Sequence, residues 1–129
     1  MVIMCRDNYK VSNVIGYLPG TSDSDSFVVI TAHYDHLGMM GKDAYFPGAN
    51  DNASGTAMML DLADYYSKAE NRLPYNIVFM ALAGEEIGLR GSQYAAENSL
   101  FPLNKIRFLI NLDMVGTGSE GITMVNLIG

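Results

Sequence analysis

Residues 27–38 read FVVITAHYDHLG, and this stretch decides the fold that we expect for the chain. Its first six residues form a continuous run of apolar and β-branched side chains, which is typical of a strand buried on both faces of a sheet. His33 and Asp35 follow at once, and residues two apart in an extended chain point to the same side. The stretch therefore predicts a buried strand that ends in a polar pair, with Asp35 within reach of the imidazole of His33.

Two later runs repeat this layout. Residues 75–82, YNIVFMAL, come shortly before Glu85 and Glu86, and residues 106–112, IRFLINL, come directly before Asp113. Parallel strands in an open α/β sheet end at one rim, which is where such sheets build their sites. We therefore expect three buried strands whose ends bring carboxylates and an imidazole to one edge of the sheet.

Two helices are expected between these strands. Residues 52–68 show helical spacing, with Asp51 or Asn52 able to cap the helix, and residues 38–48 before them indicate a glycine-rich loop. Ser92 is placed to cap a second, shorter helix. The apolar side of the longer helix is predicted to consist of Met58, Leu62 and Tyr65 or Tyr66.

The order strand, helix, strand, helix, strand predicts an α/β domain with three layers, a mostly parallel sheet flanked by helices. Residues 11–18 and 122–127 indicate one further strand each. No helix is predicted after the last strand, so one face or edge of the sheet is expected to lie bare, and we expect copies of the chain to associate there as a homo-oligomer. We interpret residues 1–129 as a single partial domain, the N-terminal portion of a larger one, truncated at its C-terminus.

The composition narrows the classes of partner. The chain has 129 residues, 49% of them hydrophobic, and a formal net charge of −6, which fits one domain with its own core. The negative charge argues against a nucleic acid or an anionic membrane surface as partner. No apolar run approaches the ~20 residues that span a bilayer, the N-terminus lacks the layout of a signal peptide, and the single cysteine, Cys5, allows no intrachain disulfide.

One imidazole and five carboxylates near the strand ends make up the donor set that a pair of zinc ions takes. Asp51 either caps the helix that follows it or bridges two metals, since its small neighbours allow close approach of the backbone. Glu85 and Glu86 diverge as adjacent residues, so one can bind metal while the other faces a reacting water as general base. Asp113 follows an apolar strand, where a lone carboxylate needs a metal or a hydrogen bond.

Four segments, taken together, resemble the motifs of a known family. They are HYDHLG at 33–38, PGANDNASG at 47–55, GEEIGLRGS at 84–92 and NLDMVG at 111–116. They look like the motifs of the zinc-dependent exopeptidases that include bacterial leucyl aminopeptidases and glutamate carboxypeptidase II, in the same order and spacing. The second and third segments are the most specific of the four.

The resemblance implies a site for two zinc ions. His33 and Asp113 would bind the first ion, Glu86 would bind the second, and Asp51 would bridge them. The peptide bond between Asp51 and Asn52 is expected to be cis, as it often is after the bridging aspartate in that family.

The resemblance also implies the reaction. Asp35 would orient His33, and Glu85 would be the general base that takes a proton from the bridging water. Such a site would hydrolyse the N-terminal peptide bond of a peptide substrate, as an aminopeptidase does.

The family's second zinc takes a further histidine from the C-terminal part of its domain. This chain has only His33 and His36. His36 lies on the same strand exit as His33 and would need an awkward loop to fill that place, so we do not expect it to substitute. The first zinc thus has three expected protein ligands and the second has only Asp51 and Glu86. We expect one ion or none in these 129 residues, and no activity from them alone.

Two other interpretations fit part of the pattern. One is a mono-zinc acyltransferase similar to glutaminyl cyclase. The intact DNASG segment at 51–55 favours the peptidase over this acyltransferase. The other is a non-catalytic interaction domain of the transferrin-receptor type, which keeps the fold without its metals. That interpretation predicts lost ligands, whereas every ligand expected within this length is present.

Overall fold

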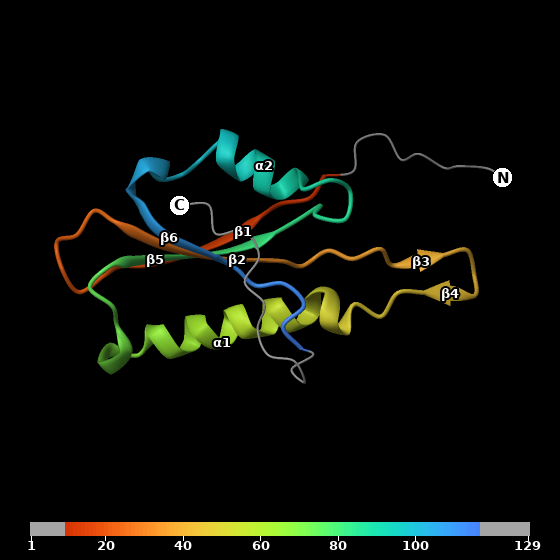
Figure 1. The fold of residues 1–129 in the computed structure, drawn as a ribbon, viewed down its shortest axis with the longest axis horizontal. Coiled ribbons are helices and arrows are strands. Elements are labelled where there is room, and N and C mark those ends of the chain that lie inside the picture. The colour runs from red at the N-terminus through yellow and green to blue at the C-terminus, as the bar shows by residue number, and fades with distance from the viewer. Residues whose placement is uncertain (1–9, 117–129) are drawn as a thin grey trace.

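The computed structural model describes residues 10–116, and in them it shows an α/β fold with three layers, a four-stranded sheet between two helices (Figure 1). The strands are β1 (Val14–Leu18), β2 (Phe27–His33), β5 (Asn76–Leu82) and β6 (Ile106–Asn111). Their spatial order is β1-β5-β2-β6, with β2 parallel to β5 and β6 and β1 antiparallel to β5. The expected α/β class, a mostly parallel sheet flanked by helices, is confirmed.

One helix covers each face of the sheet. α1 (Gly55–Ser67) lies on one face and α2 (Arg90–Glu97) on the other (Figure 1). Successive side chains of a strand point to opposite faces, so in β5 Ile77 packs with Met59 of α1 whereas Val78 packs in the core on the side of α2. The two central strands, β2 and β5, are thereby buried and form the base on which the candidate site stands.

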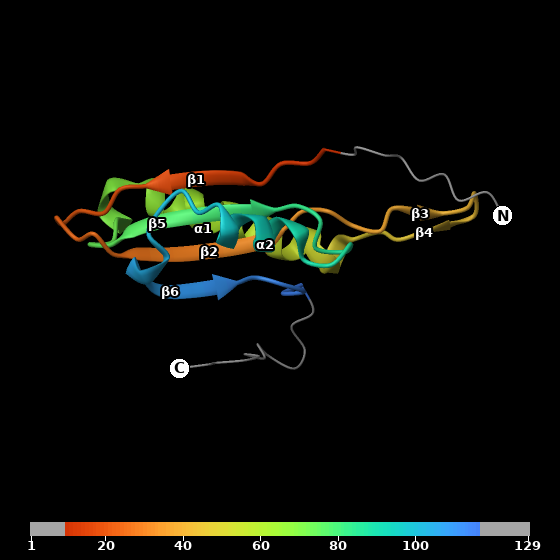
Figure 2. The same ribbon diagram turned by 90° about the horizontal axis from the view of Figure 1, so that it is seen from above.

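The third expected strand, β6, was predicted to be buried, but it is partly exposed. Phe108 and Leu109 of β6 are 54% and 53% exposed. The reason is position, because β6 forms an edge of the sheet beside β2, and the helices lie over β2 and β5 (Figure 2). An apolar run indicates a strand, but it does not tell whether a neighbouring element covers that strand.

The helix boundaries also differ from the expectation. α1 begins three residues late because the backbone at 51 and 52 is not helical, and a kinked wide turn, η1 (Ala49–Ser54), precedes it. With this start, Met59 faces the core and Met58 is exposed. Ser92 does not cap α2 but lies inside it, and its hydroxyl donates to the carbonyl of Leu89.

The expected glycine-rich loop at 38–48 contains a short antiparallel hairpin, β3 (Met39–Met40) and β4 (Ala44–Tyr45), which projects beyond the end of β2 (Figure 1). Gly41 has the positive φ of 71° that its turn requires. Two single 3₁₀ turns, η2 (Ala69–Asn71) and η3 (Leu103–Lys105), precede β5 and β6.

The expected strand at 122–127 and Cys5 lie outside the described residues. Within residues 10–116, no helix combines the length and the apolar character that crossing a membrane requires.

Candidate metal centre

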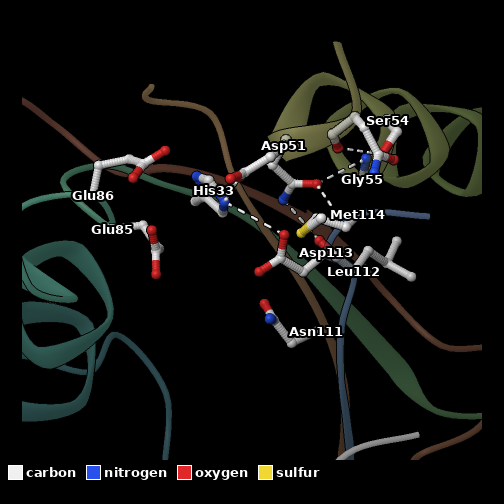
Figure 3. Close-up of polar contacts among 12 residues, drawn as sticks. His33, Asp51, Ser54, Gly55, Glu85, Glu86, Asn111, Leu112, Asp113 and Met114 are labelled. Atoms are coloured by element: carbon white, nitrogen blue, oxygen red, sulfur yellow. Dashed lines mark hydrogen bonds and ion pairs between the residues drawn. The ribbon is translucent and has the colours of Figure 1, made fainter. Parts of the chain in front are cut away.

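The predicted site residues meet at one end of the sheet. His33 is the last residue of β2, Glu85 and Glu86 follow β5, and Asp113 follows β6. These strands are parallel, so their C-terminal ends lie at the same rim. Asp51 comes from η1, just before α1, and completes the group (Figure 3).

The tightest group consists of His33, Asp51 and Asp113. The Nε2 atom of His33 lies 3.1 Å from Oδ1 of Asp51 and 3.6 Å from Oδ1 of Asp113 (Figure 3). A tetrahedral zinc with bonds of about 2.0–2.1 Å separates its ligand atoms by about 3.3 Å. The two observed distances lie on either side of that value, so the three side chains fit a metal ion.

The tautomer of His33 supports the same conclusion. Its Nδ1 atom lies 3.2 Å from the main-chain carbonyl oxygen of Asp35, and a carbonyl can only accept, so Nδ1 carries the proton. In the neutral ring the lone pair of Nε2 then faces the carboxylates of Asp51 and Asp113. A divalent metal bound between these three atoms would accept that lone pair and offset the charge of the two carboxylates.

Asp35 contacts the site differently from the sequence prediction. Its carboxylate lies 3.8 Å from Nδ1 of His33, beyond hydrogen-bonding distance, and instead accepts from the main-chain N–H groups of Glu85 and Glu86 at 3.0 and 3.2 Å. Strand alternation does not extend to Asp35 because β2 ends at His33. The main chain of Asp35 thus holds the imidazole, and its side chain holds the loop of the two glutamates.

Asn52 has two roles, of which the sequence indicated only the capping of the helix. Its side chain is 3% exposed, donates from Nδ2 to the carbonyl of Leu112 at 2.9 Å, and accepts at Oδ1 from the N–H groups of Gly55 and Met114 at 3.1 and 3.2 Å. Asn52, one of the two residues that the sequence offered as the cap, therefore pairs with the first N–H of α1. It also ties η1 to the segment after β6. The peptide bond between Asp51 and Asn52 is cis, as the resemblance implied.

A second group shares Asp51 with the first. One potential ligand atom each from His36, Asp51 and Glu86 lie within 4.8 Å of one another. His36 was not expected to reach this position, yet its Nδ1 atom lies 2.8 Å from Oε1 of Glu86. The pairing of β2 with β5 continues to the end of both strands, where the N–H of Tyr34 donates to the carbonyl of Leu82, so the segments that carry His36 and Glu86 leave the sheet side by side.

Glu85 has the electrostatic character of a proton acceptor. Burial raises the pKa of its carboxyl above the ordinary value, the neighbouring His33 lowers it, and the charges of Glu86, Asp113 and Asp35 raise it further. A carboxylate with a raised pKa takes up a proton more readily at neutral pH, which suits a general base.

Residues 13–127 match the sequence model of peptidase family M28. The chain belongs to peptidase family M28. It is 40% identical to a probable zinc metalloprotease of Pyricularia oryzae over 116 residues, which are 87% of this chain and 23% of that protein. The chain thus spans about a quarter of the length of this family member.

Solved structures agree with the family. A zinc aminopeptidase from Bacillus subtilis superposes with a TM-score of 0.64 at 37% identity, covering 81% of this chain and 24% of that one. A glutaminyl cyclase from an Acidobacteriales bacterium gives a TM-score of 0.61 at 26% identity, covering 81% of this chain and 38% of that one. The shared fold therefore extends to both kinds of enzyme named in the sequence analysis, and the relatives with higher identity are peptidases.

Proposed function

We propose that this chain carries the metal centre of a zinc-dependent aminopeptidase and forms the N-terminal portion of its catalytic domain. The observation that carries the proposal is the approach of Asp51 and Asp113 to Nε2 of the buried His33, at distances that suit a shared zinc ion. The similarity to a zinc metalloprotease and to a zinc aminopeptidase supports the choice of metal and of reaction.

The residues divide into two metal positions. His33, Asp51 and Asp113 would hold one ion, and Asp51 and Glu86 would hold the other. When bound, zinc lowers the pKa of a coordinated water and polarises the carbonyl of a scissile peptide bond. Asp51 reaches both groups, which is the placement that a bridging ligand requires.

Glu85 handles the proton in this proposal. Its carboxylate accepts the proton of the attacking water and then delivers it to the leaving amine. The loop that carries Glu85 is fixed by the carboxylate of Asp35, which accepts from the N–H of Glu85.

Zinc titration calorimetry of the full chain tests the metal centre. We expect one tight equivalent of zinc in the wild type and its loss in Asp113→Asn, which keeps the shape of the side chain but removes its charge. Asp43→Asn, at an exposed carboxylate of the hairpin, is the matched control and should bind as the wild type does. Equal zinc affinity in Asp113→Asn and Asp43→Asn would place the metal elsewhere.

A peptide with an N-terminal glutamine distinguishes the reactions. An aminopeptidase releases free glutamine, whereas a glutaminyl cyclase keeps the residue and expels ammonia. With two ligands at the second position we expect no activity from residues 1–129 alone, so the assay uses a longer chain that includes the C-terminal part with the family's further histidine, and it detects the products by mass. Glu85→Gln should lower the release of glutamine about 10²–10⁴-fold at unchanged zinc content. Loss of ammonia without release of glutamine would make the cyclase the better assignment.

A further inference from the structure

His36 is the one histidine that the proposed reaction leaves without a role. Its Nδ1 atom lies 2.8 Å from Oε1 of Glu86, and both side chains are mostly shielded from solvent. Two ligands of one tetrahedral zinc would lie about 3.3 Å apart, whereas N–H···O hydrogen bonds to carboxylates measure about 2.7–2.9 Å. The observed distance therefore fits a hydrogen bond from His36 to Glu86 better than a metal shared by the two.

The ring of His36 is held in place by the segment that leads into η1. A Cβ atom at Gly48 would lie 2.9 Å from Cδ2 of the ring, so the imidazole packs directly on the backbone there. The ring of Phe46 lies edge-to-face with it, with the ring centroids 6.3 Å apart and the planes at 76°. These contacts fix the direction of Nδ1 before any metal binds.

We propose that His36 is a positioning residue for Glu86. Its Nδ1–H group donates to Oε1 of Glu86, which holds the carboxylate in one orientation and leaves Oε2 for a metal at the position shared with Asp51. The inference rests on the proposed function, which assigns Glu86 to the second metal position. Hydrogen-bond partners of metal ligands of this kind typically contribute 10–100-fold to metal affinity.

The geometry suggests a substitution that separates positioning from ligation. The amide nitrogen of asparagine occupies nearly the place of Nδ1 in histidine and donates a hydrogen bond, but it is a poor zinc ligand. His36→Asn therefore keeps the donor, and His36→Leu removes it while it retains a comparable apolar volume against Phe46 and Gly48.

The experiment is a calorimetric titration of the full chain with zinc up to millimolar concentration. The tight first equivalent and a weak second equivalent are fitted separately, because Asp51 and Glu86 alone cannot hold the second ion tightly. His36→Leu should weaken the second equivalent 10–100-fold and leave the first unchanged, and His36→Asn should bind within about threefold of the wild type. The unchanged first equivalent shows that each variant is folded. Imidazole ¹⁵N shifts of the metal-free chain supply an independent measurement, in which Nδ1 of His36 should carry a proton.

The contradicting outcomes are distinct. If His36→Asn is as damaging as His36→Leu, His36 is itself a ligand of the second metal. If neither variant changes the second equivalent, or the wild type takes no second equivalent at millimolar zinc, His36 positions nothing. In each of these cases the wild type still binds the first zinc equivalent and Asp113→Asn still loses it. The proposed function is contradicted only if the wild type does not bind that first equivalent.

Discussion

Replacing Asn52 by alanine should lower the free energy of unfolding and weaken zinc binding together. The side chain joins the turn that carries Asp51 to the segment that carries Asp113, through hydrogen bonds to Gly55, Leu112 and Met114. All three partners are main-chain groups near the metal centre. Their loss frees the two metal-binding segments to move apart.

The magnitude follows from the count of hydrogen bonds and from burial. A typical intramolecular hydrogen bond contributes about 1 kcal/mol, and a buried group left unpaired costs about 1–3 kcal/mol. Asn52 is 3% exposed and makes three such bonds to described residues, so we expect a loss of about 3 kcal/mol. Asn71→Ala is the matched control, because the amide of Asn71 donates to the carbonyl of Tyr65 at an exposed position, where about 0.5 kcal/mol or less is expected.

Urea unfolding followed by circular dichroism gives the free energy of unfolding of both variants. An unchanged m-value shows that each variant exposes the same surface on unfolding as the wild type, so the free energies can be compared. Zinc calorimetry on the same samples should show weaker binding in Asn52→Ala and none of this effect in Asn71→Ala. If the two variants differ by less than about 0.5 kcal/mol, the hydrogen bonds of Asn52 do not fasten the site, and the reasoning fails.

Three further predictions concern packing, metal and association. Gly55→Ala should lower the free energy of unfolding in urea by about 1–3 kcal/mol, because the added Cβ would lie 2.3 Å from the carbonyl oxygen of Leu112. Gly16→Ala is the control and should be tolerated, since its added Cβ would have its nearest contact at 3.9 Å; equal losses in the two variants would contradict this. Zinc should raise the thermal midpoint of the wild type and a chelator should reverse the rise, since a metal that binds the folded state stabilises it, and Asp113→Asn should not respond. Copies of the chain should associate through the exposed side of β6, so light scattering over a concentration series should show oligomers that Leu109→Lys reduces; a monomeric wild type at high concentration would refute the association.

The sequence predicts the central strands and the place of the site well. The runs at 27–33 and 76–82 are strands in the structure because a continuous apolar segment between polar ends has few other ways to be buried. The position of His33 at a strand end follows from the same pattern. Parallel pairing then brings it near Asp113, 80 residues away in the chain, as the rule for open sheets predicts.

What the sequence does not predict depends on details of the main chain and on neighbours in space. Asp35 was expected to hold His33 through its carboxylate, which does lie 3.8 Å from Nδ1 of His33, but the hydrogen bonds of that carboxylate go to the N–H groups of Glu85 and Glu86. The contact of His36 with Glu86 arises from the course of the backbone after Tyr34. Such contacts join segments about 50 residues apart and leave no periodic signal in the sequence.

The most direct test of the central claim is a crystal structure of the chain grown with zinc, with anomalous differences measured at the zinc absorption edge. We predict a peak bonded to Nε2 of His33 and to carboxylate oxygens of Asp51 and Asp113 at about 2.0–2.2 Å. A map with no peak among these three residues at saturating zinc, or with its strongest peak elsewhere on the chain, would contradict the account.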